Sequence, residues 1–121
     1  MDIRKLQKII VSALEDIKGK DIEVINTSKL TSMFDRIVIA TGDSNRQVKS
    51  LAQNVQEKVK EAGGEIVSTE GEDGGEWVLV DLGDIVVHVM QPNVRQYYNL
   101  EELWQATPAQ RRKAVEQARE E

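Results

Sequence analysis

The chain has 121 residues, of which 40% are hydrophobic and 31% are charged, values typical of one globular domain with a single hydrophobic core. Its formal net charge of -5 argues against generic binding to nucleic-acid phosphates, which requires a basic face. Because it contains no cysteine, disulfides, thiol catalysis and cysteine metal sites are excluded.

The first part of the chain predicts one helix and two strands. Apolar residues between positions 3 and 17 recur at helical spacing, with Asp2 as the N-terminal cap and Gly19 at the end of the helix. Residues 21–26 alternate between apolar and polar, which indicates a half-buried strand. Residues 35–41 are rich in apolar side chains and predict a strand covered on both faces.

A second long helix and a third strand are predicted next. Ser44 and Gln47 have the spacing of a capping box, in which each side chain satisfies the other's free backbone N–H. The apolar stripe of this helix lies between positions 48 and 59. Residues 65–69 predict the strand, and the Gly- and acid-rich residues 70–75 predict a loop.

Residues 77–82 and 85–90 predict a β-hairpin across the two-residue turn Gly83-Asp84, which sets the register. One face of this hairpin is then entirely aliphatic and forms the core side, with the opposed pairs Leu82–Ile85, Val80–Val87 and Val78–Val89. The other face is mixed, with the opposed pairs Asp81–Val86, Leu79–His88 and Trp77–Met90. A slip by one residue would bury Asp81 and His88, so the pattern specifies its own register.

After Pro92 the pattern predicts a loop or short helix through Tyr98, followed by a clamp of Leu100, Leu103 and Trp104 against the sheet. A second capping box at residues 107–110 opens a helix with a thin apolar stripe. We therefore expect one domain at residues 1–106 and a helical tail at residues 107–121. The predicted fold class is α/β, a mixed sheet of about five strands with the two long helices on its core side.

Charge is unevenly distributed along the chain. Between positions 61 and 94 there is no Lys or Arg, while eight acidic residues fall there: Glu61, Glu65, Glu70, Glu72, Asp73, Glu76, Asp81 and Asp84. One interpretation is a solvated acidic surface. The other is an electrostatic landing site for a basic protein, since opposite fields steer association and reject wrong partners.

Two features could carry chemistry. His88 and Asp81 lie diagonally on one face of the hairpin, and a carboxylate beside an imidazole is a general-base arrangement. No Ser or Cys nucleophile stands beside them in the hairpin, and a lone histidine is a poor metal site, so a structural or binding histidine is the alternative. The segment Gly42-Asp43-Ser44 could hold an anion at a helix N-terminus, but without the glycine spacing of a phosphate loop it also fits a simple capped turn.

Trp77 and Met90 project from the mixed face of the hairpin. If another element covers them, they belong to a second layer of core. If they are open, a Trp–Met pair ringed by acidic residues is a protein-binding site, because Trp is enriched in interface hot spots and Met packs adaptably. The sequence leaves both interpretations open.

The order and spacing of several segments resemble the Iojap family, the ribosomal silencing factors known as RsfS. The resemblance extends from the first helix to Trp104. It is carried by Gly19–Ile22, Asp35–Gly42, Ser44–Val48, Glu70-Gly71, Trp77–Asp81, Gly83–Val89, Arg95, Tyr98, Leu100, Glu101, Leu103 and Trp104.

The resemblance implies a nucleotidyltransferase-like α/β fold used for binding, because Gly42 is followed by Asp43 and the paired catalytic acids are missing. It also implies attachment to the large ribosomal subunit through ribosomal protein L-fourteen, which sterically blocks subunit joining and lowers translation when nutrients are scarce. The alternative is a nucleotide-dependent transferase that uses the helix at Ser44 and the pair of His88 and Asp81. We expect a cytoplasmic protein that self-associates, with no cofactor, no metal, no membrane contact and little or no direct nucleic-acid binding. The predicted partner-binding residues are Trp77, Asp81, His88, Met90, Glu70, Arg95 and Tyr98.

Overall fold

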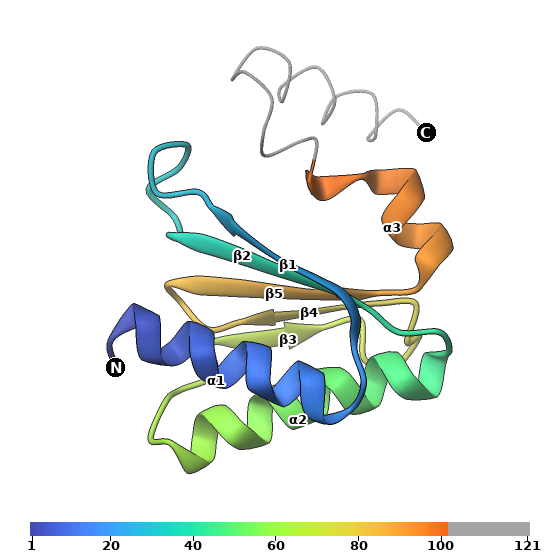
Figure 1. Ribbon diagram of the computed structural model, residues 1–121, viewed down its shortest axis with the longest axis horizontal. Helices are drawn as coiled ribbons and strands as arrows, with labels where there is room; N and C mark the ends of the chain where they lie inside the picture. Colours follow the sequence, from blue (N-terminus) through green and yellow to red (C-terminus); the bar gives the residue numbers. More distant parts are fainter. Residues whose placement is uncertain (102–121) are drawn as a thin grey trace.

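The computed structural model describes residues 1–101, so the predicted tail at residues 107–121 and the clamp residues Leu103 and Trp104 lie outside the described part. Within it the elements are, in chain order, α1 (Ile3–Asp16), β1 (Lys20–Asn26), β2 (Arg36–Thr41), α2 (Asn45–Glu61), β3 (Ser68–Glu70), β4 (Trp77–Asp81), β5 (Ile85–Met90) and α3 (Pro92–Tyr98). The two long helices, α1 and α2, cover one face of the sheet, and α3 lies on the other side (Figure 1). The predicted α/β class is confirmed.

The five described strands form one mixed sheet in the order β1-β2-β5-β4-β3. The central strands β2 and β5 run parallel, and the other neighbouring pairs run antiparallel. Every residue of β5 is buried, and so is β2 from Ile37 to Thr41. This agrees with the predicted strand covered on both faces, because parallel strands occur where both faces of the sheet are shielded.

Two apolar clusters explain why the central strands are buried on both sides. The larger lies between the helices and the sheet and includes the buried stripes of α1 and α2 together with Val78, Val80, Val87 and Val89. The smaller lies on the opposite face of the sheet, called here the outer face, and consists of Ile25, Ile37, Ile39, Met90 and Leu100. Phe34, Trp77 and Val94 pack against it.

The predicted helix starts are present, with one change at α2. Asp2 accepts a hydrogen bond from the backbone N–H of Arg4 at 2.8 Å, and Ser44 Oγ accepts one from Gln47 N–H at 3.1 Å. The return bond of the predicted capping box goes to the neighbouring residue, since Gln47 Oε1 accepts from the N–H of Asp43 at 2.7 Å. The Gln47 amide also donates to the carbonyl oxygens of Ile17 and Lys18, which ties the end of α1 to the start of α2.

The third strand is shifted and shorter than the predicted residues 65–69. In the structure β3 contains only Ser68–Glu70, paired antiparallel with β4. The β4–β5 hairpin, by contrast, has the predicted register, with Trp77 opposite Met90 and Leu79 opposite His88. None of the helices in the described residues is long and apolar enough to cross a membrane.

Candidate protein-binding face

The outer face of the sheet gathers the side chains that the hairpin pattern predicted for its mixed side. Trp77 and Leu79 on β4 and His88 on β5 share this face because side chains alternate along a strand. Neither α1 nor α2 reaches it (Figure 1). The hairpin turn is stabilised locally, since Gly83 N–H donates to Asp81 Oδ1 at 2.9 Å and Leu82 N–H donates to the carbonyl of Ile85 at 3.0 Å.

His88 is bonded to Trp77. The indole Nε1–H of Trp77 donates to His88 Nδ1 at 3.0 Å, with the ring centroids 5.8 Å apart. The pair is diagonal in the hairpin register, a position from which long side chains reach each other. The predicted pairing of His88 with Asp81 is not the arrangement found, because the Asp81 carboxylate accepts from the turn N–H of Gly83. The geometry therefore does not support His88 and Asp81 as a general-base pair.

Burial keeps the His88 ring uncharged. Only 8% of the residue is exposed, and the loss of water around the imidazolium lowers the pKa of His88 from 6.5 to about 4. At neutral pH the ring is neutral, and one nitrogen carries the hydrogen. Because the indole N–H of Trp77 can only donate, His88 Nδ1 is the acceptor and the hydrogen resides on Nε2.

A pocket of about 410 Å³ lies beside His88 on the outer face. It brings together three of the predicted partner-binding residues, Glu70, Asp81 and His88, with Ser68 as a further polar group. The rest of its lining is apolar: Met33, Phe34, Ile37, Leu79, Val86 and Leu100. No sequence pattern marks Met33, which is 81% exposed, because it stands in the connector between two predicted strands.

A chain of three aromatic rings begins at His88, which Trp77 contacts. Trp77 packs on Tyr98 with centroids 4.9 Å apart, and Tyr98 packs on Tyr97 with centroids 5.0 Å apart. Tyr97 is 62% exposed and Tyr98 is 43% exposed. The Trp77–Tyr98 contact joins β4 to α3, so the position of α3 determines the shape of this aromatic surface.

Arg95 holds α3 against the strand ends. Its guanidinium donates to Glu101 at 2.6 Å and to Thr41 Oγ1 at 2.8 Å, and it also donates to the backbone carbonyl of Asp21. An ion pair with Glu23 at 3.7 Å completes the set, which leaves the side chain 13% exposed. Arg95 was predicted as a partner contact, and in this position it connects α3 to β1 and β2.

Met90 requires a correction. The sequence allowed it to be either an open contact residue or part of a second layer of core. In the structure it is 0% exposed and packs in the cluster with Ile25, Ile37 and Leu100. The covering residues come from β1, β2 and the segment after α3, so Met90 is part of the core beneath the outer face and is not a contact residue. Trp77, its partner in the hairpin, is only half-buried.

The helix start at Ser44 is occupied by the protein's own groups. The Gln47 side chain accepts from the backbone N–H of Asp43, and the Ser44 side chain accepts from the backbone N–H of Gln47. The Asp43 carboxylate forms an ion pair with Lys20. This arrangement matches the capped-turn interpretation of the sequence. The described residues contain no group of three or more His, Cys, Asp or Glu placed to hold a metal ion.

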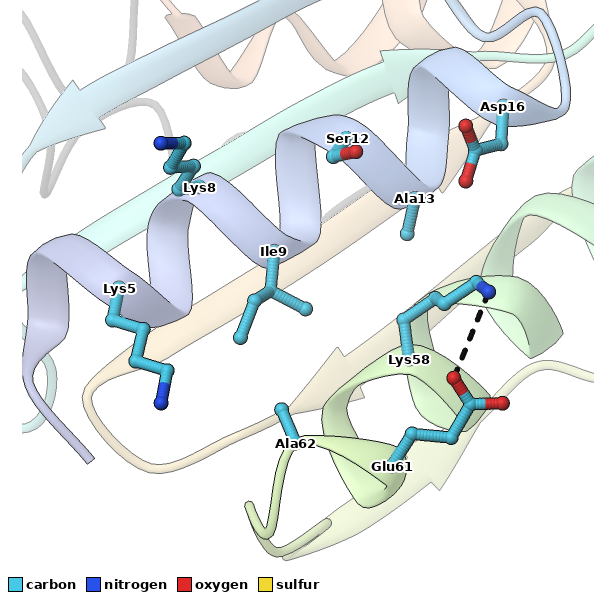
Figure 2. A pocket seen from close by; sticks show the side chains of 9 residues that line it. All are labelled: Lys5, Lys8, Ile9, Ser12, Ala13, Asp16, Lys58, Glu61 and Ala62. Atoms are coloured by element: carbon cyan, nitrogen blue, oxygen red, sulfur yellow. Dashed lines mark ion pairs between the residues drawn. The ribbon is translucent and has the colours of Figure 1, made fainter.

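A second pocket, of about 670 Å³, lies on the helical side between α1 and α2 (Figure 2). Its apolar lining consists of the short or half-buried side chains of Ile9, Ala13 and Ala62. Charges of both signs surround it, and the Lys58–Glu61 ion pair at 3.6 Å stands on its α2 side. With no aromatic residue and no dominant charge, this pocket is a weaker candidate for partner binding than the outer face.

The fold is that of a small α/β domain with aromatic and acidic side chains on the outer face of its sheet. A family model described as ribosomal silencing factor during starvation, RsfS, matches residues 1–121, and the chain belongs to this family. It is 64% identical to the ribosomal silencing factor RsfS of Chromobacterium violaceum over 104 residues, which cover 86% of this chain and 85% of that protein.

Solved and more distant relatives agree with this assignment. A crystal structure of a Chromobacterium violaceum protein superposes with a TM-score of 0.86 at 62% identity, covering 88% of this chain and 89% of that one. A mouse protein named mitochondrial assembly of ribosomal large subunit protein 1 is 32% identical over 99 residues, which are 79% of this chain and 43% of that protein. The predicted family is therefore confirmed.

Proposed function

We propose that this protein binds the large ribosomal subunit through ribosomal protein L-fourteen, using the outer face of its sheet, and thereby blocks subunit joining. The action is steric and needs no catalytic step, cofactor or metal. It takes place in the cytoplasm and lowers translation when nutrients are limiting. Membership of the ribosomal silencing family supports a ribosomal role, and the name of the mouse relative supports the large subunit.

The observation that carries this proposal is the combination of exposed aromatic rings with acidic groups. Trp77 and Tyr98 form an aromatic surface of the kind that supplies binding hot spots. Glu70 and Asp81 line the pocket on the same face, where Glu70 is exposed and Asp81 is half-buried. A basic ribosomal protein complements such a surface, while nucleic-acid phosphates are repelled by it.

Binding to isolated large subunits tests the proposal. Trp77→Ala removes the aromatic anchor, and we expect about 2 kcal/mol of binding free energy to be lost. Co-sedimentation with large subunits measures this, and a subunit-joining assay measures the functional consequence. Lys58→Ala, on the helical side of the molecule, is the matched control and retains binding. A folded Trp77→Ala protein that co-sediments like the wild type contradicts the placement of the interface.

Salt dependence provides an independent test of the acidic surface. If charges on this face steer association, the association rate falls as ionic strength rises, because salt screens the attraction. Stopped-flow measurement at several salt concentrations shows whether this happens. Self-association of the free chain stays a prediction, and sedimentation velocity measures it.

A further inference from the structure

His88 has one hydrogen-bonding nitrogen in use and one still available. Its Nδ1 accepts from Trp77, so the neutral ring carries its hydrogen on Nε2. Within residues 1–101 the His88 side chain forms no hydrogen bond other than the one to Trp77. A buried donor without a partner is uncommon in folded proteins because it has lost its water without replacement. His88 is such a group, 8% exposed and lining the pocket on the outer face.

The pocket limits which acceptor can meet this donor. Glu70 and Asp81 line the same pocket, so a carboxylate or phosphate entering it is repelled. A Lys or Arg head group is attracted by the two acids but has no lone pair to offer His88. An uncharged oxygen, such as a backbone carbonyl, satisfies both conditions. The apolar part of the lining, which includes Phe34, Leu79 and Leu100, fits an apolar side chain next to that carbonyl.

We propose that this pocket is a specificity subsite for one segment of the basic ribosomal protein, in which His88 Nε2–H donates to a backbone carbonyl of the bound segment. An apolar side chain of the segment enters the pocket, and a neighbouring Lys or Arg lies against Glu70 and Asp81. Trp77 is a positioning residue for this contact, because its indole N–H selects the ring form that carries hydrogen on Nε2. The inference rests on the proposed function and names the chemistry of the same face.

Substitutions at His88 test the donor directly. His88→Phe keeps a ring but removes the N–H, and we expect the Kd for isolated large subunits to rise about tenfold, the effect of one lost hydrogen bond. His88→Gln retains an amide N–H near the position of Nε2, and we expect its Kd to stay within about threefold of the wild-type value. Folding of each variant is checked by urea denaturation. Equal binding by the Phe variant and the wild type overturns the inference.

A double-mutant cycle tests the positioning role of Trp77. Trp77→Phe keeps an aromatic ring at this position and removes the indole N–H, so its effect on the His88 contact passes through the ring of His88. We expect Trp77→Phe combined with His88→Phe to weaken binding by less than the sum of the two single losses. Fully additive losses overturn the positioning role.

A measurement on the free wild-type protein covers the case in which a variant does not fold. Nitrogen-15 NMR of the imidazole distinguishes the two neutral ring forms, and we expect hydrogen on Nε2. Hydrogen on Nδ1 overturns the inference. The failures of the two proposals are distinguishable, because loss of large-subunit binding in Trp77→Ala but not in His88→Phe sinks only the subsite. Wild-type protein that does not bind large subunits sinks the proposed function and the subsite together.

Discussion

The buried, neutral His88 makes the stability of the fold depend on pH. Its pKa is about 4 in the folded chain against 6.5 for the free side chain. Below pH 6.5 the unfolded chain therefore takes up a proton that the folded chain refuses until about pH 4. The stabilisation is complete above pH 6.5 and is lost as the pH falls. At about 1.4 kcal/mol for each pH unit, the loss at pH 4 amounts to about 3 kcal/mol.

Urea denaturation followed by circular dichroism, at a series of pH values from about 7.5 to about 4, measures this contribution. His88→Gln is the comparison, because it lacks the titrating ring and keeps the acidic groups that face it, Glu70 and Asp81. We expect the wild type to lose about 3 kcal/mol more of unfolding free energy than the variant over this range. Parallel pH profiles for the two proteins refute the reasoning, since they require the folded and unfolded chains to bind the His88 proton equally.

Two further substitutions test the packing of the outer face. Met90→Ala leaves a cavity among Ile25, Ile37 and Leu100, and we expect a loss of about 2–5 kcal/mol in urea denaturation; a loss below about 1 kcal/mol is inconsistent with full burial. Gly71 has φ +86, and a Cβ there overlaps the carbonyl oxygen of Trp77. Gly71→Ala is therefore expected to destabilise the fold by about 1–2 kcal/mol or more and to shift the indole fluorescence, whereas Gly74→Ala, with open space around it, changes neither measurement.

The difference between the predicted and observed partners of His88 has a physical explanation. The sequence placed His88, Asp81 and Trp77 on one face, which the hairpin register confirms. A carboxylate is a familiar partner of an imidazole, which made Asp81 one of the two interpretations that the sequence left open. Asp81, however, stands two residues before Gly83, and a short acidic side chain at a turn bonds the backbone N–H two residues ahead. That local signal was present in the sequence, and it leaves Trp77 as the partner of His88.

The contacts of Arg95 could not be predicted from the sequence. A family motif marks Arg95 as important without saying what it touches. Its partners lie at Asp21, Glu23, Thr41 and Glu101, three of them more than 50 positions away along the chain. A guanidinium with five fixed donors can join several distant segments at once. Which segments they are follows only from the arrangement of the sheet around α3.

The sequence by itself determined the two long helices, the buried central strands, the hairpin register and the stretch of acidic residues. These features depend on neighbours close along the chain: apolar spacing, caps and a two-residue turn. The tertiary structure decided which parts of the outer face are covered and which stay open. Met90 is buried because Ile25 from β1 and Leu100 from beyond α3 pack around it, while Trp77 and Tyr98 remain partly exposed near His88. Long-range packing is the physical reason, because it brings together residues whose separation in the chain carries no local pattern.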